Sequence, residues 1–581
     1  MNVNLKINGI DVSVPKGTTI LEAAKTIGIE IPTLCYMKEI NEIGACRICV
    51  VEVKGAKSLV AACVFPVNEG MEVWTNSPAV LKARKMTLEL ILSNHNKSCL
   101  SCVRSENCEL QKLCKDFKVD TLTRFIGSTT PSAVDDSAPH MVRDNSKCIL
   151  CRRCVAVCKH NQGVSVIGAN ERGFATHIGC AFEEDLANSP CISCGQCIVN
   201  CPTGALHEKD DTEKVWEALQ DPSKHVVVQA APAVRAALGE EFGLPIGTNV
   251  ERKMLTAMRM LGFDKVFDTN FSADLTILEE AHEFLDRVQN GGTLPLITSC
   301  SPGWIKFCEY YYPEFTENLS SCKSPQQMFG AVTKTWYAEK NELDPKDIVC
   351  VSIMPCTAKK FELGRDDEAA AGVPDVDISI TTREFARMIK RACITLENLP
   401  DGEYDNPLGT FTGAGVIFGA TGGVMEAALR TAVETLTGKE LEKLDFTDVR
   451  GTEGIKEATY NVAGMDINVC VCSGTANAAK VLDAVKKGEK NYHFIEVMGC
   501  PGGCVNGGGQ PIHPASVTNF TDVKALRAKV LYDEDAAMPL RKSHDNPVVK
   551  ALYDEYLGEP GSHKAHDILH TTYVKRDRYA D

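Results

Sequence analysis

Apolar and polar residues alternate at the start of the chain, in MNVNLKINGIDVSVPKG, a pattern typical of a strand hairpin. A helical stretch, LEAAKTIG, and a loop with cysteines follow. From about residue 80 the periodicity becomes helical (LKARKMTLELILSNH), and a polar, proline-containing stretch, GSTTPSAVDDSAP, then indicates a linker. These changes predict a small mixed-sheet domain at 1–80 and a second, helical domain at 81–125.

From about residue 215, apolar strand-like runs alternate with helical stretches. The runs are HVVVQAAPAV, TLPLITSC, DIVCVSIMPC and HFIEVMGC, and this alternation is typical of parallel sheets flanked by helices. Three of the runs end at a cysteine, namely Cys300, Cys356 and Cys500. Because folds of this class place ligands at the carboxyl ends of their strands, these cysteines predict a shared site. We expect an α/β domain at 215–530 and a polar, helical segment at 531–581.

The region between these parts, 138–212, contains an internal repeat. CILCRRCVAVC and CISCGQCIVNC lie 43 positions apart, and each has the C-x2-C-x2-C-x3-C spacing of bacterial ferredoxins, except that Lys159 stands where proline is usual. In that pattern the fourth cysteine of each run binds the other cluster, which predicts two 4Fe-4S sites. Their ligands are Cys148, Cys151, Cys154 and Cys201 for one, and Cys191, Cys194, Cys197 and Cys158 for the other. Zinc would require separated ligand pairs, and disulfides an oxidising compartment.

Two further ligand groups lie in the first two domains. The spacing C-x10-C-x2-C-x13-C offers four thiolates for a 2Fe-2S cluster or, alternatively, for zinc, from Cys35, Cys46, Cys49 and Cys63. The spacing H-x3-C-x2-C-x5-C offers an imidazole and three thiolates for a 4Fe-4S cluster of raised potential, from His95, Cys99, Cys102 and Cys108. Clusters this close together pass electrons from one to the next, so we expect a catalytic site at the end of this electron relay.

Composition limits the class of protein further. The chain has 581 residues, enough for several domains, and 27 cysteines, whose spacing favours clusters. The formal net charge of -15 argues against nucleic acid, which requires a basic face. No run of 18 apolar residues and no signal peptide is visible, so we expect a cytoplasmic protein without a membrane span.

Three cysteine-bearing segments resemble the signatures of the iron-only (FeFe) hydrogenases: TSCSPGW at 298–304, MPCTAKKFE at 354–362 and EVMGCPGGCVNGGGQP at 496–511. SCKSPQQMFGAVTKT, DVDISITTREFARMIK and GATGGVMEAALR are also similar to that family, so the resemblance covers nearly the whole chain. The first domain resembles the 2Fe-2S domain of hydrogenases and NADH dehydrogenases.

The resemblance implies the fold, the cofactors and the activity. The fold would be multidomain α+β and α/β: a 2Fe-2S ferredoxin-like domain, a domain whose 4Fe-4S cluster has one histidine and three cysteine ligands, a two-cluster ferredoxin domain, a two-lobed catalytic domain and a small-subunit-like C-terminal segment. The cofactors would be one 2Fe-2S cluster, three accessory 4Fe-4S clusters and an H-cluster, which joins a 4Fe-4S cluster to a di-iron unit with carbon monoxide and cyanide ligands. The activity would be reversible reduction of protons to H2.

The resemblance also implies roles for residues around the H-cluster. Cys356, Cys500 and Cys504 would hold its 4Fe-4S part, Cys504 would also bridge to the di-iron unit, and Lys359 would donate to a cyanide. A dry pocket around the di-iron unit would be lined by Ala231, Pro232, Pro325, Gln326, Met354, Phe418 and Met498. Glycines after Cys500 would let the backbone fold closely around the cofactor.

A proton route is implied through Cys300, Glu280, Ser320, Glu283 and Arg287. The two glutamates and the arginine have helical spacing, which by itself equally describes an ordinary ion-pair face. Position 301 departs from the family, which has a second cysteine there as the fourth cluster ligand. Either Ser301 binds iron as an alkoxide, or Cys300 turns inward as the ligand.

Several alternatives remain open from the sequence. The electrons could come from soluble ferredoxin, or from NAD(P)- and flavin-binding partner subunits, since the chain has no convincing dinucleotide fingerprint. The family requires maturation proteins to insert the di-iron unit. A non-catalytic assembly or sensory homologue would fit the loss of cysteine at 301, and an NADH-dehydrogenase-type relay subunit would explain residues 1–210 only.

Overall fold

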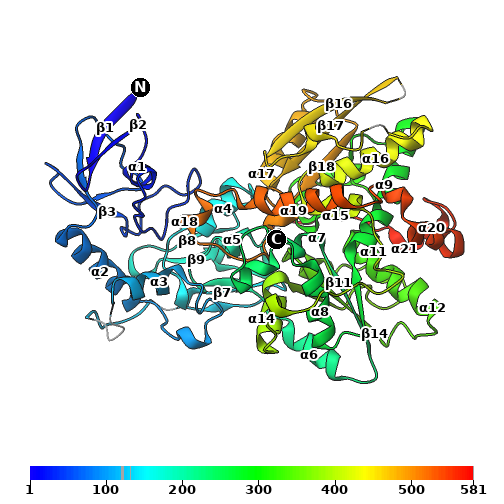
Figure 1. The fold of residues 1–581 in the computed structure, drawn as a ribbon, viewed down its shortest axis with the longest axis horizontal. Helices are drawn as coiled ribbons and strands as arrows, with labels where there is room; N and C mark the ends of the chain where they lie inside the picture. Colours follow the sequence, from blue (N-terminus) through cyan, green and yellow to red (C-terminus); the bar gives the residue numbers. More distant parts are fainter. Residues whose placement is uncertain (120–123, 131, 442, 463, 580–581) are drawn as a thin grey trace.

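The computed structural model describes residues 1–119, 124–130, 132–441, 443–462 and 464–579. Residues 120–123 of the expected second domain, residue 131 of the linker, residues 442 and 463 of the expected catalytic domain and residues 580–581 of the C-terminal segment therefore lie outside the described residues. The molecule is elongated, with the N-terminal sheet at one end, the two catalytic sheets at the other and the cysteine repeat between them (Figure 1).

The N-terminal domain contains the predicted hairpin, in which β1 (Asn2–Ile7) pairs antiparallel with β2 (Ile10–Pro15). The sheet has the order β2-β1-β5-β3-β4, and its other strands are β3 (Val50–Val53), β4 (Val60–Ala61) and β5 (Glu72–Trp74). Helix α1 (Ile20–Thr26) covers it and begins with a capping box between Thr19 and Glu22.

Short helices carry the cysteine groups that follow. The second domain consists of α2 (Pro78–Ser93) and α3 (Glu109–Asp116), and Cys108 caps α3. In the repeat, α4 (Arg153–His160) and α5 (Gln196–Val199) follow the first cysteines of the two runs. Two small sheets frame them, made of β6 (Val134–Asp135), β7 (Met141–Asp144) and β10 (Leu206–Glu208), and of β8 (Ile167–Asn170) and β9 (His177–Cys180).

The first catalytic sheet is parallel throughout and has the order β12-β11-β14-β15. Its strands are β11 (His225–Ala230), β12 (Lys265–Asp268), β14 (Ile348–Met354) and β15 (Ile378–Thr381). Both faces are apolar because helices cover both: α8 (Glu251–Leu261) and α14 (Thr382–Arg391) on one side, α9 (Thr269–Asn290) and α11 (Pro325–Val332) on the other.

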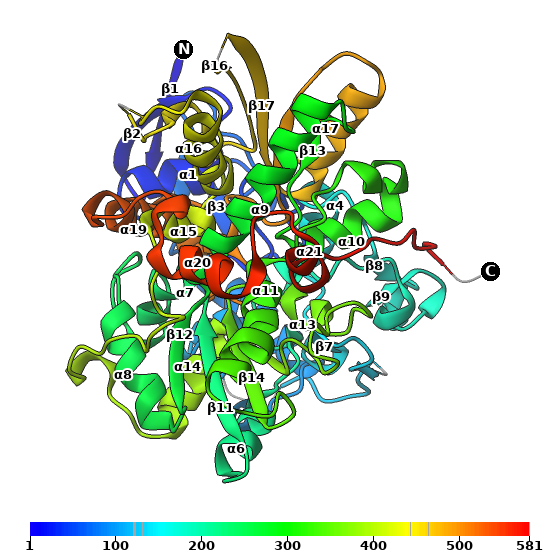
Figure 2. The ribbon, with the colours of Figure 1, turned by 90° about the vertical axis from the view of Figure 1, so that its right-hand side faces the viewer.

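The second catalytic sheet has the order β13-β18-β17-β16, in which only β16 is antiparallel to its neighbour. Its strands are β13 (Leu296–Ile297), β16 (Ile455–Val462), β17 (Met465–Ser473) and β18 (Phe494–Met498). Helices α10 (Pro302–Tyr311) and α17 (Thr475–Lys486) cover one face, and α9 and α16 (Gly423–Thr437) the other. Helix α9 thus contributes to the cores of both lobes (Figure 2).

The C-terminal helices pack on the catalytic lobes. They are α19 (Val523–Ala537), α20 (Pro547–Leu552) and α21 (His563–Leu569), and the expected boundary between residues 530 and 531 falls inside α19. In the described part of the chain, no helix combines the length and apolar character that a membrane crossing needs.

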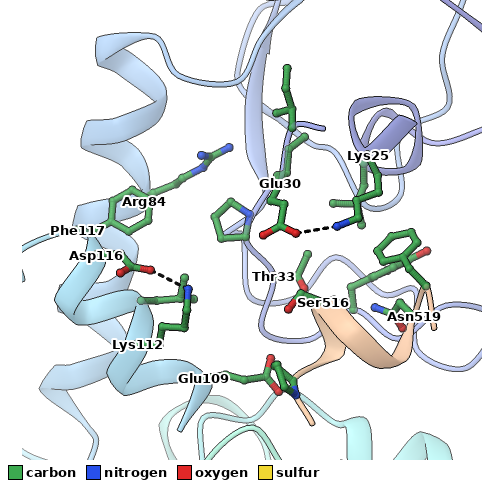
Figure 3. Close-up of a pocket in the computed structure, with 18 residues that line it drawn as sticks. Lys25, Glu30, Thr33, Arg84, Glu109, Lys112, Asp116, Phe117, Ser516 and Asn519 are labelled. Carbon is green, nitrogen blue, oxygen red and sulfur yellow. Dashed lines mark hydrogen bonds and ion pairs between the residues drawn. The ribbon is translucent and has the colours of Figure 1, made fainter. Parts of the chain in front are cut away.

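A hollow at the junction of the N-terminal domains is lined by the loop after α1, by α2 and α3, and by α18 (Ala515–Thr518) of the catalytic domain (Figure 3). Lys25 pairs with Glu30 at 2.7 Å, and Lys112 with Asp116 at 3.1 Å. Each pair lies within one domain, so these four charges are compensated locally.

Candidate active site and cluster sites

Segments that are far apart in the sequence meet at the carboxyl ends of β11, β13, β14 and β18. A cavity between the two sheets, close to α9, is lined by three of the four predicted cysteines (Cys300, Cys356 and Cys504), by the lysine and by all seven predicted apolar-pocket positions. Its lining residues are Ala231, Pro232, Thr269, Ala273, Cys300, Ser301, Pro325, Gln326, Met354, Pro355, Cys356, Lys359, Phe418, Gly419, Met498 and Cys504. Most of these side chains are apolar, so the cavity is suited to excluding water.

The three thiols expected to hold a cluster lie together. Burial raises the pKa of Cys500, and the neighbouring Cys356 and Cys504 thiols raise it further. Cys500 does not line the cavity; its sulfur instead lies 3.9 Å from the carbonyl oxygen of Cys194 in the repeat. Ser301, just before α10, faces the cavity and accepts a hydrogen bond from the amide of Gly499 at 3.2 Å.

The glycines after Cys500 are needed for close backbone packing. A Cβ at Gly503 would lie 2.6 Å from the amide nitrogen of Thr421, and the φ of Gly503 is +94°. A Cβ at Gly508 would overlap the carbonyl of Cys194. Only glycine permits both approaches, and the second brings the repeat against the catalytic domain.

Lys359 reaches the cavity from α13 (Ala358–Glu362). Its ammonium donates to Glu362 at 2.9 Å, to the hydroxyl of Ser324 at 2.7 Å and to the carbonyl of Cys300 at 3.3 Å. Glu362 also accepts from Gln326 at 2.9 Å. These contacts fix a buried positive charge at the edge of the cavity.

The residues of the expected proton route lie near one another, and hydrogen bonds join Ser320, Glu283 and Arg287. Burial raises the pKa of Glu280 to about 8, with a further contribution from the Glu283 carboxylate, while burial and Glu280 raise the pKa of Cys300. Ser320 donates to Glu283 at 2.8 Å, and Arg287 donates to Glu283 at 2.6 Å. The side chains of Glu283 and Arg287 are each 15% exposed, so this group of residues reaches the surface.

The cysteines of the repeat line two separate cavities. One is lined by Cys148, Cys151, Cys154 and Cys201, and the other by Cys158, Cys191, Cys194 and Cys197. Each cavity therefore receives three thiols from one run and one from the other. Enclosed groups of four soft donors fit 4Fe-4S clusters.

The ligand groups of the first two domains are also brought together. The sulfurs of Cys49 and Cys63 lie 3.3 Å apart, and Cys35 hydrogen-bonds Cys46. His95 is half-buried, its Nδ1 atom is fully enclosed and lacks a hydrogen-bond partner, and burial lowers its pKa. An enclosed ring nitrogen without a hydrogen-bond partner fits a ligand of a metal cluster.

Some residues around the cavity were missed by the sequence reasoning. Thr269, Ala273, Pro355 and Gly419 complete its lining, and they carry no recognisable signal because small and apolar residues are common in cores. Glu362 stands three positions after Lys359 on one helix, and this spacing could have indicated an ion pair.

Known protein families match the chain in consecutive segments. The iron only hydrogenase large subunit, C-terminal domain, matches residues 224–508, and the iron hydrogenase small subunit matches 521–576. The 2Fe-2S iron-sulfur cluster binding domain matches 1–78, which favours 2Fe-2S over zinc there. The NADH-ubiquinone oxidoreductase-G iron-sulfur binding region matches 84–122, and the 4Fe-4S dicluster domain matches 147–205.

Individual relatives agree with these families. The NADP-reducing hydrogenase subunit HndD of Solidesulfovibrio fructosivorans is 49% identical over 99% of both chains, and iron hydrogenase 1 of Clostridium pasteurianum is 45% identical over 98% of this chain and 99% of its own length. A solved structure of the apo [FeFe]-hydrogenase HydA1 from Chlamydomonas reinhardtii, a variant, matches with a TM-score of 0.56, 43% identity, and coverage of 62% of this chain and 99% of that chain.

These comparisons also bear on the alternatives left open by the sequence. A relay subunit of the NADH dehydrogenase type leaves residues 224–508 unexplained, and full-length similarity to hydrogenases disfavours a non-catalytic homologue. The chain belongs to the iron-only (FeFe) hydrogenases.

Proposed function

We propose that this chain interconverts protons and H2 at the cavity between its two catalytic sheets, and exchanges electrons through its N-terminal clusters with an NAD(P)-linked partner subunit. The observation that carries the proposal is the meeting of Cys300, Ser301, Cys356, Lys359 and Cys504 on one cavity. These residues come from three segments that only the fold brings together.

In this proposal Cys356, Cys500, Cys504 and Ser301 would hold the 4Fe-4S part of the H-cluster, and Cys504 would also hold its di-iron unit, which carries carbon monoxide and cyanide ligands. When bound, the H-cluster would supply the redox chemistry that interconverts protons and H2. Ser301 is favoured as the fourth donor because its oxygen faces the cavity and lies beside the backbone that leads into Cys500. Cys300 remains free for proton transfer.

Lys359 would orient the di-iron unit. Its ammonium is held by Ser324 and Glu362 on one side and faces the cavity on the other, where it can donate to an anionic cyanide. The apolar residues around it lower the local dielectric, which strengthens that interaction.

Protons pass between the cavity and the surface through Cys300, Glu280, Ser320, Glu283 and Arg287. Glu280 has a pKa of about 8, so near neutral pH it can both hold and release a proton. Ser320 passes the proton to Glu283 by rotation of its hydroxyl, and Arg287 keeps the Glu283 carboxylate in place at the surface.

Electrons pass along the long axis of the molecule. We assign residues 1–80, 81–125 and 138–212 to three electron-transfer domains with one 2Fe-2S and three accessory 4Fe-4S clusters, 215–530 to the catalytic domain and 531–581 to the segment that covers it. The contact between Cys500 and Cys194 supports entry to the active site from the second cluster of the repeat, since it joins a ligand of each. The elongated arrangement supports an outer end at the N-terminal domains.

The partner is inferred from the relative named NADP-reducing hydrogenase subunit, with which this chain is collinear over 99% of its length. This chain shows no dinucleotide fingerprint, so nicotinamide and flavin would bind to other subunits. Soluble ferredoxin is the alternative electron donor or acceptor.

Expression of the full chain with maturation proteins would test the proposal. We expect infrared bands of bound carbon monoxide and cyanide, and H2 production from a reduced dye. Matured chain that shows accessory clusters but neither of these would contradict it. Size-exclusion chromatography of the native complex, followed by assay of H2-dependent NAD(P) reduction, separates a partner complex from a chain that works with ferredoxin alone.

A further inference from the structure

The two halves of the cysteine repeat provide an internal comparison. Cys148 and Cys191 occupy equivalent positions, and each sulfur accepts a hydrogen bond from the backbone amide two residues later. The amide of Leu150 lies 3.4 Å from Cys148 and that of Ser193 lies 3.5 Å from Cys191. The backbone hydrogen bonds to these two equivalent sulfurs are therefore the same in both proposed cluster sites.

His140 breaks this symmetry. Its Nε2 atom lies 3.7 Å from the sulfur of Cys191, its side chain is 2% exposed, and its Nδ1 atom has no hydrogen-bond partner. Within the described residues, the sulfur of Cys191 is thus the one hydrogen-bond partner of the imidazole ring. A proton on Nε2 lets the ring donate to this sulfur. Among the same residues, the hydrogen-bond donor found for the sulfur of Cys148 is the amide of Leu150, and no histidine donates to this sulfur.

Lys306 of α10 adds a positive charge on the same side. It is 8% exposed, donates to the hydroxyl of Ser193 at 3.3 Å and lies 4.2 Å from the centre of the Phe361 ring. No carboxylate within the described part of the chain forms an ion pair with it, because nearby Glu309 is held by Arg365 and Arg576.

The first half of the repeat has a buried cation too, but its charge is compensated. Arg153 follows Cys151 and Cys148 in the chain, and both of its terminal nitrogens donate to Glu109, at 2.7 and 3.1 Å.

Two other side chains lie beside the first cluster, but neither donates to a sulfur. Arg104 is 5% exposed, and its guanidinium donates to the carbonyls of Asn107 and Cys201. The hydroxyl of Thr203 lies 3.7 Å from the sulfur of Cys201, but its proton is donated to the carbonyl of Lys147. The two halves therefore differ in the imidazole that His140 presents to a cluster sulfur.

We propose that the imidazole of His140, with the ammonium of Lys306 on the same side, raises the reduction potential of the cluster bound by Cys158, Cys191, Cys194 and Cys197. Reduction adds negative charge to the cluster and its sulfurs, so a hydrogen-bond donor and an uncompensated cation stabilise the reduced form. The inference rests on the ligand assignment of the proposed function.

The raised potential matters for catalysis. H2 formation needs two electrons, whereas each cluster passes one at a time. The cluster with the raised potential has Cys194 as a ligand, and Cys194 contacts Cys500 of the active site. An electron held on this cluster is therefore next to the active site that takes it up. His140 and Lys306 are positioning residues in this scheme, since they act on the cluster and contact no substrate.

Redox titration of the full-length chain, monitored by electron paramagnetic resonance, tests the proposal. The chain is produced without maturation proteins, so that H2 turnover does not enter the measurement. The variants are His140→Leu, which removes the donor, His140→Gln, which keeps an N–H group, and Lys306→Met. His207→Leu is the matched control, because His207 is a half-buried histidine of the same domain with an unpartnered Nδ1 atom.

We expect His140→Leu and Lys306→Met to lower the midpoint potential of the same 4Fe-4S signal, identified as the one lost in Cys158→Ala. The ratio of reduced to oxidised cluster at a fixed potential should fall about tenfold for His140→Leu, a shift of ~59 mV for one electron. His140→Gln should recover part of the shift, and His207→Leu should leave all signals unchanged.

Intact signals with unchanged potentials in His140→Leu and Lys306→Met would overturn the proposal. If both His140 variants lose the cluster, Lys306→Met decides: a lowered potential supports the proposal and an unchanged one overturns it. If the unsubstituted chain lacks two distinct ferredoxin-type signals, the ligand assignment of the proposed function is refuted instead. This result distinguishes a failure of the proposed function from a failure of the present inference.

Discussion

The hydroxyl of Ser320 donates to the carboxylate of Glu283 at 2.8 Å, and both groups lie close enough to the buried Glu280 to shift its pKa. The hydroxyl has a single proton, so a proton that Ser320 passes to Glu283 must be replaced from Glu280, which has to be protonated to supply it. The raised pKa of Glu280, about 8, makes that protonation state available near neutral pH.

Substitution Ser320→Ala should therefore interrupt the route without altering the clusters. We expect H2 turnover to fall by about 10²–10⁴-fold, the contribution typical of positioned proton transfer. Dye-linked H2 assays report the loss, and infrared spectra should remain unchanged. The control is Ser321→Ala, since the hydroxyl of Ser321 bonds His570 at 2.8 Å; equal losses in both variants would contradict the assignment.

Lys359 and Lys360 are adjacent buried lysines that face different ways. Lys359 reaches the cavity, whereas Lys360 pairs with Asp211 and Glu384 away from it. We expect Lys359→Met to abolish the carbon monoxide and cyanide infrared bands and to lower turnover by at least about 10²-fold, because an electrostatic anchor is lost. Lys360→Met should retain the bands. Normal bands in Lys359→Met would show that the ammonium does not hold the di-iron unit.

Position 301 can be tested without any measurement of activity. If Ser301 is a ligand, Ser301→Cys should raise the potential of the active-site 4Fe-4S cluster, because an alkoxide is a harder donor that favours ferric iron more than a thiolate does. Redox titration of unmatured chain measures the shift. The pair Ser301→Ala and Cys300→Ala identifies the ligand: loss of the signal in Cys300→Ala alone would assign the fourth position to Cys300.

Glu368 should make the chain less stable as the pH rises. It is 4% exposed, and its Oε2 atom has no hydrogen-bond partner, although the ammonium of Lys323 lies 3.7 Å away. Burial together with the Glu362 carboxylate raises its pKa from 4.5 to about 8. The native state therefore binds a proton that the unfolded state releases between these values. The resulting stabilisation is complete below about pH 4.5 and is lost as the pH rises through about 8.

Substitution Glu368→Gln should reduce this decline, although Glu280 contributes in the same direction. Denaturant unfolding at a series of pH values measures the slope. Glu317→Gln, at an exposed position, serves as the control and should leave the slope unchanged. An unaltered slope in Glu368→Gln would mean that the carboxyl group is ionised in the native state.

The electron relay could be predicted largely from local spacing. In the repeat, three ligands of each cluster lie within seven residues, and the crossed fourth ligand follows from the pattern; the cavities lined by four cysteines each have that crossed composition. The strands that carry the site could also be predicted, because buried parallel strands are continuous apolar runs. The residues of the di-iron pocket were predicted from the family resemblance and not from spacing, since apolar pocket residues have the same sequence pattern as residues of any hydrophobic core.

The residues that adjust the chemistry depend on contacts between distant parts of the chain. His140 meets Cys191 across 51 positions, Ser301 meets Gly499 across 198, and Cys500 meets Cys194 across 306. No local pattern encodes such contacts, because they depend on how separately folded sheets and loops pack. The types of ligand, their grouping and the altered position 301 are visible in the amino-acid sequence. Which buried histidine, lysine and glutamate lie beside them follows only from the fold, since hydrogen bonds and charges act over a few ångströms of space rather than along the chain.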